Sequence, residues 1–204
     1  NAFKNGIDIH SATASKVWRV DLACVDKTMR SKAKAVNFGI IYGISPFGLS
    51  QNIGISRKEA KQIIDQYFEE FSKVKSYIDE SIEKARKDQY VETLMGRRRY
   101  LANINSKNAV IRSVSERNAI NAPIQGLAAD IIKKAMISIQ AELQSNRMKS
   151  KMLLQVHDEL IFDMYSEETE MLKEIVKRCM ENATQLEVPL VVDMGEGENW
   201  LQAH

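Results

Sequence analysis

The sequence predicts an α+β protein in which helices dominate and the few strands form hairpins. Apolar residues recur at helical spacing through most of the 204 residues, whereas strand-like alternation is confined to short runs. Proline and glycine are sparse, at 3 and 9 residues, and neither a low-complexity tract nor an internal repeat is present. With 44% hydrophobic residues, the chain can bury a substantial core as one large domain or two small ones.

The first half of the chain contains clear helix signals and one hairpin pattern. A helix is expected over residues 26–43, because an Asp cap precedes the periodic stretch and glycines end it. Ser56 and Glu59 have the spacing of a capping box, and apolar residues follow at helical intervals. Residues 89–103 alternate around a glycine, which predicts a short β-hairpin.

The second half of the chain continues the alternation of helices and short strands. Helical periodicity covers residues 109–144, and Pro123 predicts a break or kink within it. Residues 151–165 place two apolar runs around a polar tip, which predicts a buried hairpin. A helix over residues 167–185 and a last strand over residues 188–194 are expected to follow.

The net charge of +2, from 29 Lys and Arg against 27 Asp and Glu, is too small to indicate a nucleic-acid partner. Its distribution is more informative, because acidic residues crowd into 65–83 and 167–181 while basic residues cluster elsewhere. One basic face on an otherwise acidic surface is therefore predicted. The basic clusters comprise Arg30, Lys32, Lys34, Arg97, Arg98, Arg99, Arg112 and Arg117.

Cysteine content and hydropathy favour a reduced, cytoplasmic setting. Cys24 and Cys179 lie far apart in apolar or amphipathic surroundings, which argues against a disulfide framework or a zinc site. The sequence contains neither a long apolar run of membrane-spanning length nor a basic-then-apolar leader, so no membrane partner is expected. It begins with Asn1 rather than methionine, and we expect further chain upstream.

Arg30, Lys34, Phe38 and Tyr42 lie four residues apart in the first predicted long helix. Each step of four advances about 40° around an α-helix, so these side chains form one slowly turning stripe. Two cations followed by two aromatic rings can hold the phosphates of a nucleotide and stack on its sugar or base. The same spacing fits a solvated basic turn whose aromatics reach the core, and spacing alone leaves both interpretations open.

Two further groups of polar residues stand out. Arg117, Asn121 and Gln125 again step by four, as expected of a polar helix face, although Pro123 lies inside the run. Asp158 and Glu159 are adjacent carboxylates between apolar strands, an arrangement that is costly unless a positive partner such as magnesium joins them. An ordinary exposed turn, with Asp158 as turn former beside a solvated histidine, is the alternative.

The segment RSKAKAVNFGIIYG, residues 30–43, closely resembles the motif B helix of family A DNA polymerases, whose pattern is Arg, Lys, Phe and Tyr-Gly at intervals of four. The resemblance implies that Arg30 and Lys34 contact the incoming triphosphate and that Lys34 is also a catalytic residue. It implies that Phe38 packs on the nucleotide's sugar and base and that Tyr42 holds the template-base site. His10, in DIHSATA, matches another triphosphate-contacting position of the family.

The resemblance continues in the family's order along the whole chain, through QYVETLMGRRRYL to the terminal GENWLQAH, and is closest to the bacterial, DNA-polymerase-I-like branch. ERNAINAPIQGLAADII resembles the palm helix and implies that Arg117, Asn121 and Gln125 touch primer-template DNA. Amides suit such contacts, since every base pair offers minor-groove acceptors. QVHDEL resembles motif C. This implies that Asp158 and Glu159 are catalytic residues that bind metal and that His157 supports the primer terminus.

The resemblance implies a polymerase right-hand fold in part, with helix-rich fingers inserted in an antiparallel-sheet palm. Residues 1–106 are then mainly fingers with motif B, and residues 107–204 the C-terminal part of the palm with motif C. The implied activity is DNA-directed DNA polymerisation in replication and repair. The implied cofactor is a pair of Mg²⁺ ions, and the implied partners are primer-template DNA and deoxynucleoside triphosphates. A monomer in the bacterial cytoplasm, associated with the nucleoid, is expected.

One element of the family's catalytic site is missing from the sequence. The family takes a second essential aspartate from motif A, a DYSQIELR-like strand that precedes motif B, and Asp8 and Asp21 have no such context. We therefore expect motif A, together with the upstream palm, thumb and exonuclease segments, to lie before Asn1. The 204-residue chain is expected to be inactive alone.

Two other functions are compatible with parts of the pattern. A single-subunit RNA polymerase shares the basic helix and the acidic hairpin, but Phe38 and Glu159 fit the DNA polymerase form better. A noncatalytic nucleic-acid-binding module with the same fold is the other alternative. Mere DNA binding needs neither an acidic tip nor a triphosphate-facing helix, which argues against that module.

Overall fold

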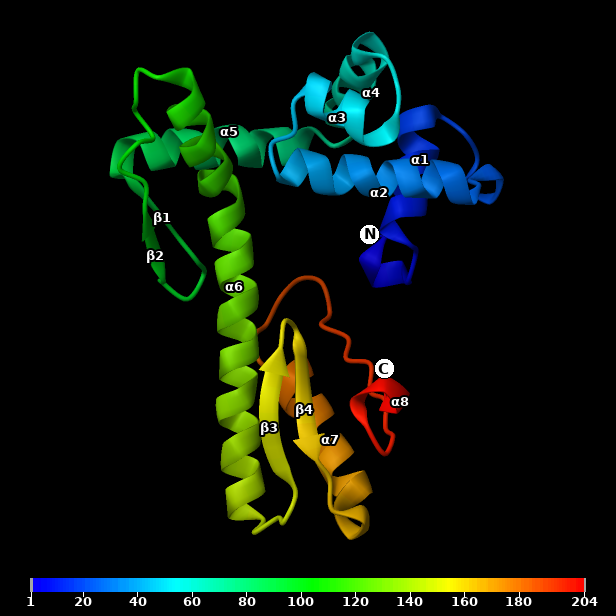
Figure 1. Ribbon diagram of the computed structural model, residues 1–204, viewed down its shortest axis with the longest axis vertical. Helices are drawn as coiled ribbons and strands as arrows, with labels where there is room; N and C mark the ends of the chain where they lie inside the picture. Colours follow the sequence, from blue (N-terminus) through cyan, green and yellow to red (C-terminus); the bar gives the residue numbers. More distant parts are fainter. Residues whose placement is uncertain (1, 204) are drawn as a thin grey trace. The chain divides into compact units, whose positions relative to one another are not determined.

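The protein, described over residues 2–203 by a computed structural model, forms two compact units. The first ends at Gly126 and the second begins at Leu127. Helices make up most of both, and the strands of the described residues form two separate two-stranded antiparallel sheets. The predicted α+β class is confirmed (Figure 1).

The first unit opens with a series of helices that begin at side-chain caps. Asp8, Asp26, Ser45 and Ser56 each accept a hydrogen bond from a backbone N–H in the first turn of the helix that follows. The predicted helix over 26–43 and the predicted capping box are confirmed. The helices are α1 (Ile9–Trp18), α2 (Lys27–Ile41), α3 (Pro46–Ile53), α4 (Arg57–Glu70) and α5 (Ser72–Asp88), with 3₁₀ turns at Phe3–Asn5 and Leu22–Cys24.

Apolar faces of α1 to α4 enclose the main core of the first unit. Val17 of α1, Val36 of α2 and Leu49 of α3 are almost completely buried there, and Ile63 of α4 joins them. Burying a side chain of this kind contributes roughly 1.5–3 kcal/mol. This packing fixes the rotation of α2 about its axis and so decides which of its residues face solvent.

The predicted hairpin of residues 89–103 is confirmed as β1 (Tyr90–Glu92) paired with β2 (Arg98–Tyr100). Gly96 provides the positive φ of the turn, at 81°. Val91 belongs to a second core of the unit, which it shares with Ile104 and with Ala119 of helix α6. The hairpin is thus fixed beside the helix that carries the second group of predicted site residues.

Helix α6 (Ala109–Ser145) is continuous through Pro123, so the break that the sequence predicted there does not occur. Proline removes one backbone donor, and a helix of 37 residues retains the hydrogen bonds on both sides of it. Helix α6 carries residues of both units.

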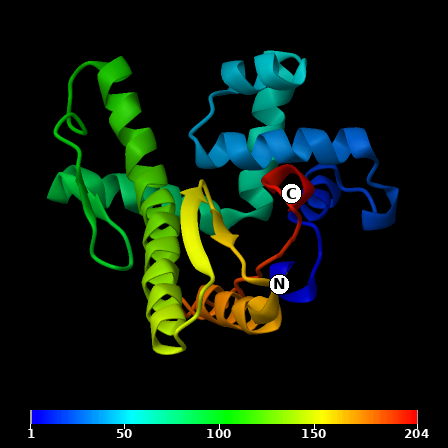
Figure 2. The same ribbon diagram turned by 60° about the horizontal axis from the view of Figure 1, so that its bottom comes forward.

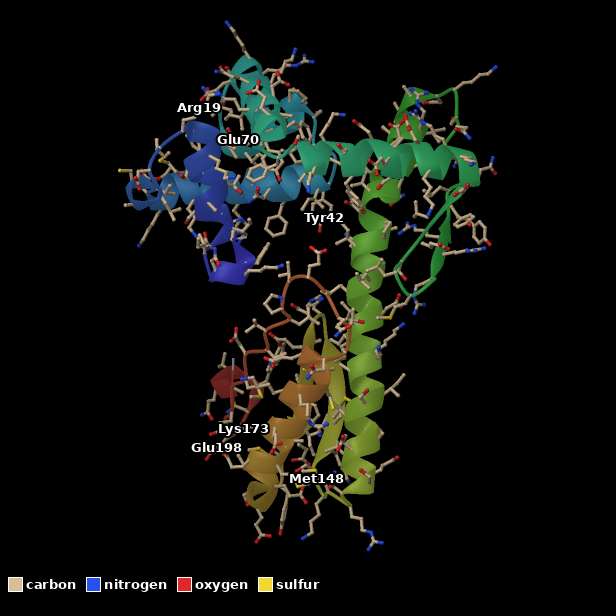
Figure 3. All side chains as sticks on the ribbon, turned by 180° about the vertical axis from the view of Figure 1, so that it is seen from behind. Arg19, Tyr42, Glu70, Met148, Lys173 and Glu198 are labelled. Carbon is tan, nitrogen blue, oxygen red and sulfur yellow. The ribbon has the colours of Figure 1, made fainter. Side chains whose placement is uncertain are left out.

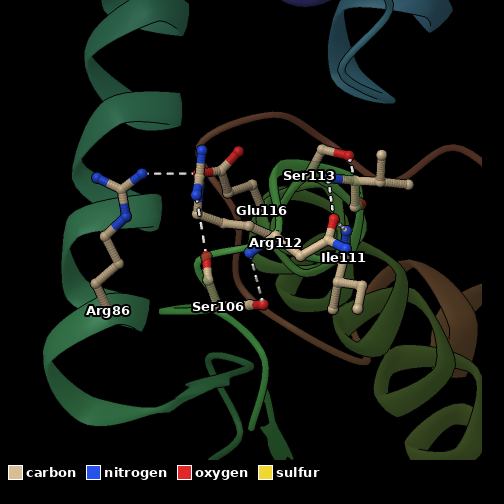
Figure 4. Close-up of polar contacts among 8 residues, drawn as sticks. Arg86, Ser106, Ile111, Arg112, Ser113 and Glu116 are labelled. Carbon is tan, nitrogen blue, oxygen red and sulfur yellow. Dashed lines mark hydrogen bonds and ion pairs between the residues drawn. The ribbon is translucent and has the colours of Figure 1, made fainter.

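The start of α6 is tied to α5 by an ionic network (Figure 4). Arg86 Nη2 donates to Glu116 Oε1 at 2.7 Å, and Arg112 Nε lies 3.5 Å from the same oxygen. Arg112 Nη1 also donates to the backbone carbonyl of Ser106 at 3.0 Å. Arg112, one member of the predicted basic clusters, is therefore engaged in holding the unit together.

The second unit packs a hairpin and a helix against the later turns of α6. Strand β3 (Lys151–Val156) pairs with β4 (Glu159–Asp163), which confirms the predicted hairpin. Its predicted burial is wrong, because every residue of the two strands is exposed or half-buried. The helices that follow are η3 (Ser166–Glu168), α7 (Thr169–Glu181) and α8 (Trp200–Ala203). Ile139 and Leu143 of α6 meet a row of buried residues on α7, with Phe162 of β4 packed against them. Figure 2 shows the orange ribbon of α7 beside the later turns of α6.

Two predictions for the last part of the chain are wrong. The helix expected over 167–185 ends at Glu181, and residues 188–194 form no strand. An extended segment becomes a strand only when another strand accepts and donates its ladder hydrogen bonds, and none of the described strands pairs with this one. Within the terminal GENWLQAH segment, His204 lies outside the described residues.

The two cysteines lie in different surroundings. Cys24 is exposed and Cys179 is buried, and both are free thiols. Burial raises the pKa of the Cys179 thiol. Within residues 2–203, none of the helices has the length and apolarity required to cross a membrane.

Candidate functional site

The predicted stripe of α2 faces away from the core of the first unit. Arg30, Lys34 and Phe38 lie on α2. Tyr42, which is labelled in Figure 3, is the residue that ends the helix. Both rings are 48% exposed, while the opposite face of the helix buries Val36 and Ile40. This exposure rules out the interpretation in which the aromatics serve only the core.

His10 lies beside this stripe, in the first turn of α1. Its Nδ1 is 3.0 Å from the amide Nδ2 of Asn37, and its ring centroid is 5.8 Å from that of Phe38. Partial burial lowers the pKa of His10, the nearby positive charges of Arg30 and Lys34 lower it further, and Asp8 opposes them. The predicted triphosphate contacts His10, Arg30 and Lys34 are thus close enough to interact electrostatically.

Asp8 forms a bidentate ion pair with Arg30. Arg30 Nε donates to Asp8 Oδ1 at 3.1 Å, and Nη2 donates to Oδ2 at 2.8 Å. Asp8 Oδ1 also accepts from the backbone N–H of Ser11 at 2.8 Å, as the N-cap of α1. Chiefly through the hydrogen bond from Arg30, the pKa of Asp8 is held well below its usual range, and that of Arg30 is raised.

Arg117 of α6 lies against the end of α2. Gly43, just after Tyr42, has a φ of 67°, and a Cβ atom there would stand 2.9 Å from Arg117 Cγ. Glycine is therefore required on two grounds, the positive φ and the close approach of this side chain. The structure thus brings Arg117, the first residue of the second predicted group, next to Gly43, which follows Tyr42.

Asn121 and Gln125 lie one and two turns further along α6. The side-chain oxygen of Asn121 is buried and has no hydrogen-bond partner within residues 2–203, which is costly unless a ligand supplies a donor. Gln125 borders a pocket of about 240 Å³ between α6 and the β1–β2 hairpin. Three consecutive arginines, Arg97, Arg98 and Arg99, line the same pocket, and Arg98 is paired with Glu92.

The second unit carries the predicted acidic tip. His157 and Asp158 form the two-residue turn between β3 and β4, and Val156 pairs with Glu159. His157 has a φ of 52°, and its carbonyl accepts from Gln155 Nε2 at 2.7 Å. Asp158 is exposed, whereas Glu159 is half-buried at the start of β4.

Carboxylate oxygens are suitable ligands for Mg²⁺, so the donor chemistry of Asp158 and Glu159 fits that ion. Two adjacent residues nevertheless offer only part of a ligand set. The described part of the chain contains no group of three or more His, Cys, Asp or Glu side chains arranged to hold a metal. The tip alone therefore offers only part of what a magnesium site requires.

Sequence reasoning missed two residues of this arrangement, Asp8 and Asn37. Asp8 directly precedes a helix, which is the position of an N-cap, but nothing local indicates that it pairs with an arginine 22 residues away. Asn37 carries a clearer signal, because an amide stands among the apolar positions that face the core.

Comparison with known proteins identifies relatives over almost the whole chain. The model of a family described as DNA polymerase family A matches residues 1–202. DNA polymerase I of Caldicellulosiruptor bescii is 54% identical over 202 residues, covering 99% of this chain and 24% of the relative. DNA polymerase I of Bacillus subtilis is also 54% identical over 202 residues, with 99% and 23% covered. The chain thus spans about a quarter of the length of these relatives.

A solved structure has the same fold. The polymerase domain of Pol1 from M. smegmatis, in complex with DNA primer-template and dNTP, superposes with a TM-score of 0.94 at 44% sequence identity. The match covers 99% of this chain and 36% of that one.

Proposed function

Because the chain belongs to DNA polymerase family A, we propose that it forms part of a DNA-directed DNA polymerase that extends a primer on a DNA template. The observation that carries this proposal is the exposed stripe of α2. It presents two cations and two aromatic rings to solvent, with His10 beside them. A structural role alone does not require that combination on an exposed helix face.

The substrates proposed are primer-template DNA and deoxynucleoside triphosphates. The related Pol1 domain is described in complex with both, which supports the same partners for this chain. Arg117, Asn121 and Gln125 are proposed to contact the DNA. Asn121 and Gln125 are suited to sequence-independent minor-groove contacts, and the unpaired amide oxygen of Asn121 supports this assignment.

In the proposed mechanism, the chain positions and neutralises the triphosphate. Arg30, Lys34 and His10 offset its negative charge, Phe38 packs on the sugar and base, and Tyr42 borders the template base. Arg30 keeps N–H groups for this purpose, because Asp8 occupies only its Nε and one edge of Nη2.

Asp158 and Glu159 are proposed to hold catalytic Mg²⁺, and His157 to support the primer terminus. Bound magnesium lowers the pKa of the primer 3′-hydroxyl and stabilises the leaving pyrophosphate. Asp158 and Glu159 would supply two of the ligands of the magnesium site, and the other ligands are proposed to come from the rest of a longer polymerase.

The remaining assignments follow from membership of a bacterial polymerase branch. Residues 1–106 are proposed as mainly fingers and residues 107–204 as the C-terminal part of the palm. The whole enzyme is proposed to act as a monomer in replication and repair, in the bacterial cytoplasm at the nucleoid. Its upstream palm, thumb and exonuclease segments would surround the present chain.

Primer extension by the 204-residue chain and by a longer polymerase that contains it tests the proposal. We expect template-directed synthesis from the longer protein with magnesium and a matched primer-template. The chain alone should give none, because Asp158 and Glu159 approach the metals from a single hairpin and fewer phosphates are neutralised.

An Asp158→Ala variant of each protein controls for contaminating polymerase. Failure of the longer protein to extend any primer would contradict the proposed function. Robust synthesis by the chain alone that depends on Asp158 would contradict the proposed division of the metal site.

A further inference from the structure

Asn37 is a buried amide on the core-facing side of α2. Its neighbours on that face are Ala33, Val36, Gly39 and Ile40, and only 9% of its surface is exposed. Burying an amide costs free energy unless its polar atoms find partners, so a residue of this kind needs a reason to be there. The structure provides one, since Asn37 Nδ2 lies 3.0 Å from His10 Nδ1.

This contact determines which nitrogen of His10 carries the proton. In the orientation that the Asn37 amide has here, its Nδ2 faces the ring; an amide nitrogen donates and does not accept, so His10 Nδ1 is the acceptor in this arrangement. A neutral imidazole with an unprotonated Nδ1 carries its proton on Nε2. Packing against Phe38 at 5.8 Å between ring centroids restricts the orientation of the same ring.

The charged groups around His10 favour its neutral form. Arg30 and Lys34 face it from α2 and Asp8 from the start of α1. Burial and the two cations lower the pKa of His10, and Asp8 opposes this only in part. A neutral histidine binds an anion by donating a hydrogen bond from its single ring N–H. The contact with Asn37 places that N–H on Nε2.

We propose that Asn37 is a positioning residue that holds neutral His10 as the Nε2–H tautomer, so that this nitrogen donates a hydrogen bond to a phosphate oxygen of the bound triphosphate. The inference rests on the proposed function, because it takes the triphosphate as the ligand of His10. It adds that His10 acts as a neutral donor beside the two cations Arg30 and Lys34. The contribution of His10 to nucleotide binding then does not change with pH above the pKa of His10.

Asn37→Asp tests the inference with almost no change of shape. The introduced carboxylate accepts a hydrogen bond from Nδ1–H and raises the pKa of His10. Below the raised pKa the imidazolium still donates from Nε2. As the pH rises through the raised pKa, the imidazolium loses the proton of Nε2 and keeps the one on Nδ1. The lone pair of Nε2 then faces the phosphate and cannot donate a hydrogen bond to it. Asn52→Asp, on the exposed side of α3, is the matched control.

Two measurements are needed. Imidazole ¹⁵N NMR of the unsubstituted 204-residue chain reports the tautomer directly, and His10→Ala identifies which signal belongs to His10. The KM for a deoxynucleoside triphosphate, measured against pH in the longer polymerase, reports the consequence. We expect Nε2–H in the native chain. We expect Asn37→Asp to raise KM about fivefold as the pH rises, the value of one hydrogen bond, while Asn52→Asp follows the native enzyme.

A native His10 that carries its proton on Nδ1 would overturn the inference. The inference would also fail if His10→Ala raised KM while the Asn37→Asp enzyme kept the native pH profile. That result would leave the proposed function intact. If His10→Ala itself leaves KM unchanged, the assignment of His10 to the triphosphate fails, and the inference fails with it.

Discussion

The stripe of α2 and the tip of the β3–β4 hairpin both carry charged side chains assigned to polymerase chemistry, but their surroundings hold them differently. On α2, Arg30 donates two hydrogen bonds to Asp8, and the ring of Phe38 packs against His10. At the tip, Asp158 is an exposed turn residue, and no ion pair in the described part of the chain engages it.

This difference indicates what each region needs from outside. The side chains of α2 are oriented by α1, which lies next to it in sequence and in the main core of the same unit. The arrangement on α2 therefore does not need a ligand to form. The metal site proposed at the tip, in contrast, needs cations that offset its two adjacent carboxylates.

Asp158→Asn in the longer polymerase should have the largest effect. The substitution keeps the shape of the turn and removes the charge proposed to hold magnesium, and bound magnesium is expected to supply several kcal/mol of transition-state stabilisation. We expect kcat to fall about 1000-fold while the Kd for primer-template stays near the native value. Asp163→Asn, at the exposed end of the same strand pair, is the control and should remain active. Equal losses in both variants would show that the tip has no special role.

Lys34→Ala should impair nucleotide use by a smaller amount. A charge-assisted hydrogen bond contributes about 1.5–3 kcal/mol, so we expect kcat/KM for the triphosphate to fall roughly 10- to 100-fold. DNA affinity should change little, because this charge is assigned to the incoming phosphates. Steady-state extension and DNA-binding titrations on one preparation separate the two effects. Lys32→Ala, on the same helix but outside the stripe, is the control. Equal losses of nucleotide use and DNA binding in Lys34→Ala would reject the assignment.

Features of the molecule that depend on local chemistry could be predicted from the sequence. The caps at Asp26 and Ser56 follow from side chains that satisfy first-turn N–H groups, and the hairpins follow from alternation around polar turns. The four-residue spacing correctly places Arg30, Lys34 and Phe38 on one exposed stripe. These interactions span only a few residues, so the pattern contains the information.

Features that depend on a distant partner could not be predicted. Residues 188–194 have a strand-like composition, but none of the described strands pairs with them. The pairing of Asp8 with Arg30 depends on how α1 packs on α2. At Pro123 a local signal allowed either a break or a kink, and the break does not occur because a long packed helix tolerates the loss of one hydrogen bond. The roles assigned to the site residues remain predictions.

Phe38→Tyr should relax discrimination against dideoxynucleotides. The ring is exposed beside His10 and is assigned to the nucleotide sugar, where a phenolic hydroxyl can supply the polar group that a missing 3′-hydroxyl leaves unfilled. One hydrogen bond is worth about 1 kcal/mol, so we expect the ratio of dideoxy to deoxy incorporation to rise severalfold. Competition between the two substrates measures it, with Phe3→Tyr as a control at another exposed ring. An unchanged ratio would place Phe38 away from the sugar.

Asp8→Asn should have the smallest effect, a loss of less than about 1 kcal/mol in the free energy of unfolding of the chain at neutral pH. Both partners of the ion pair are roughly half exposed, so water screens their attraction. Asparagine is as good an N-cap as aspartate and can still accept from Ser11, which isolates the ion pair from the cap. Urea titrations of both proteins measure the difference.

The pH dependence of that difference identifies its origin. Arg30 depresses the pKa of Asp8, so the folded state binds its proton more weakly than the unfolded state does. The stabilisation is fully present above the ordinary value of 3.8 and shrinks as the pH falls below it, as the carboxyl of the unfolded chain and then that of the folded chain take up a proton. Added salt should reduce it as well. A difference that persists unchanged in acid would attribute the effect to the cap, and α1 would then hold Arg30 through packing alone.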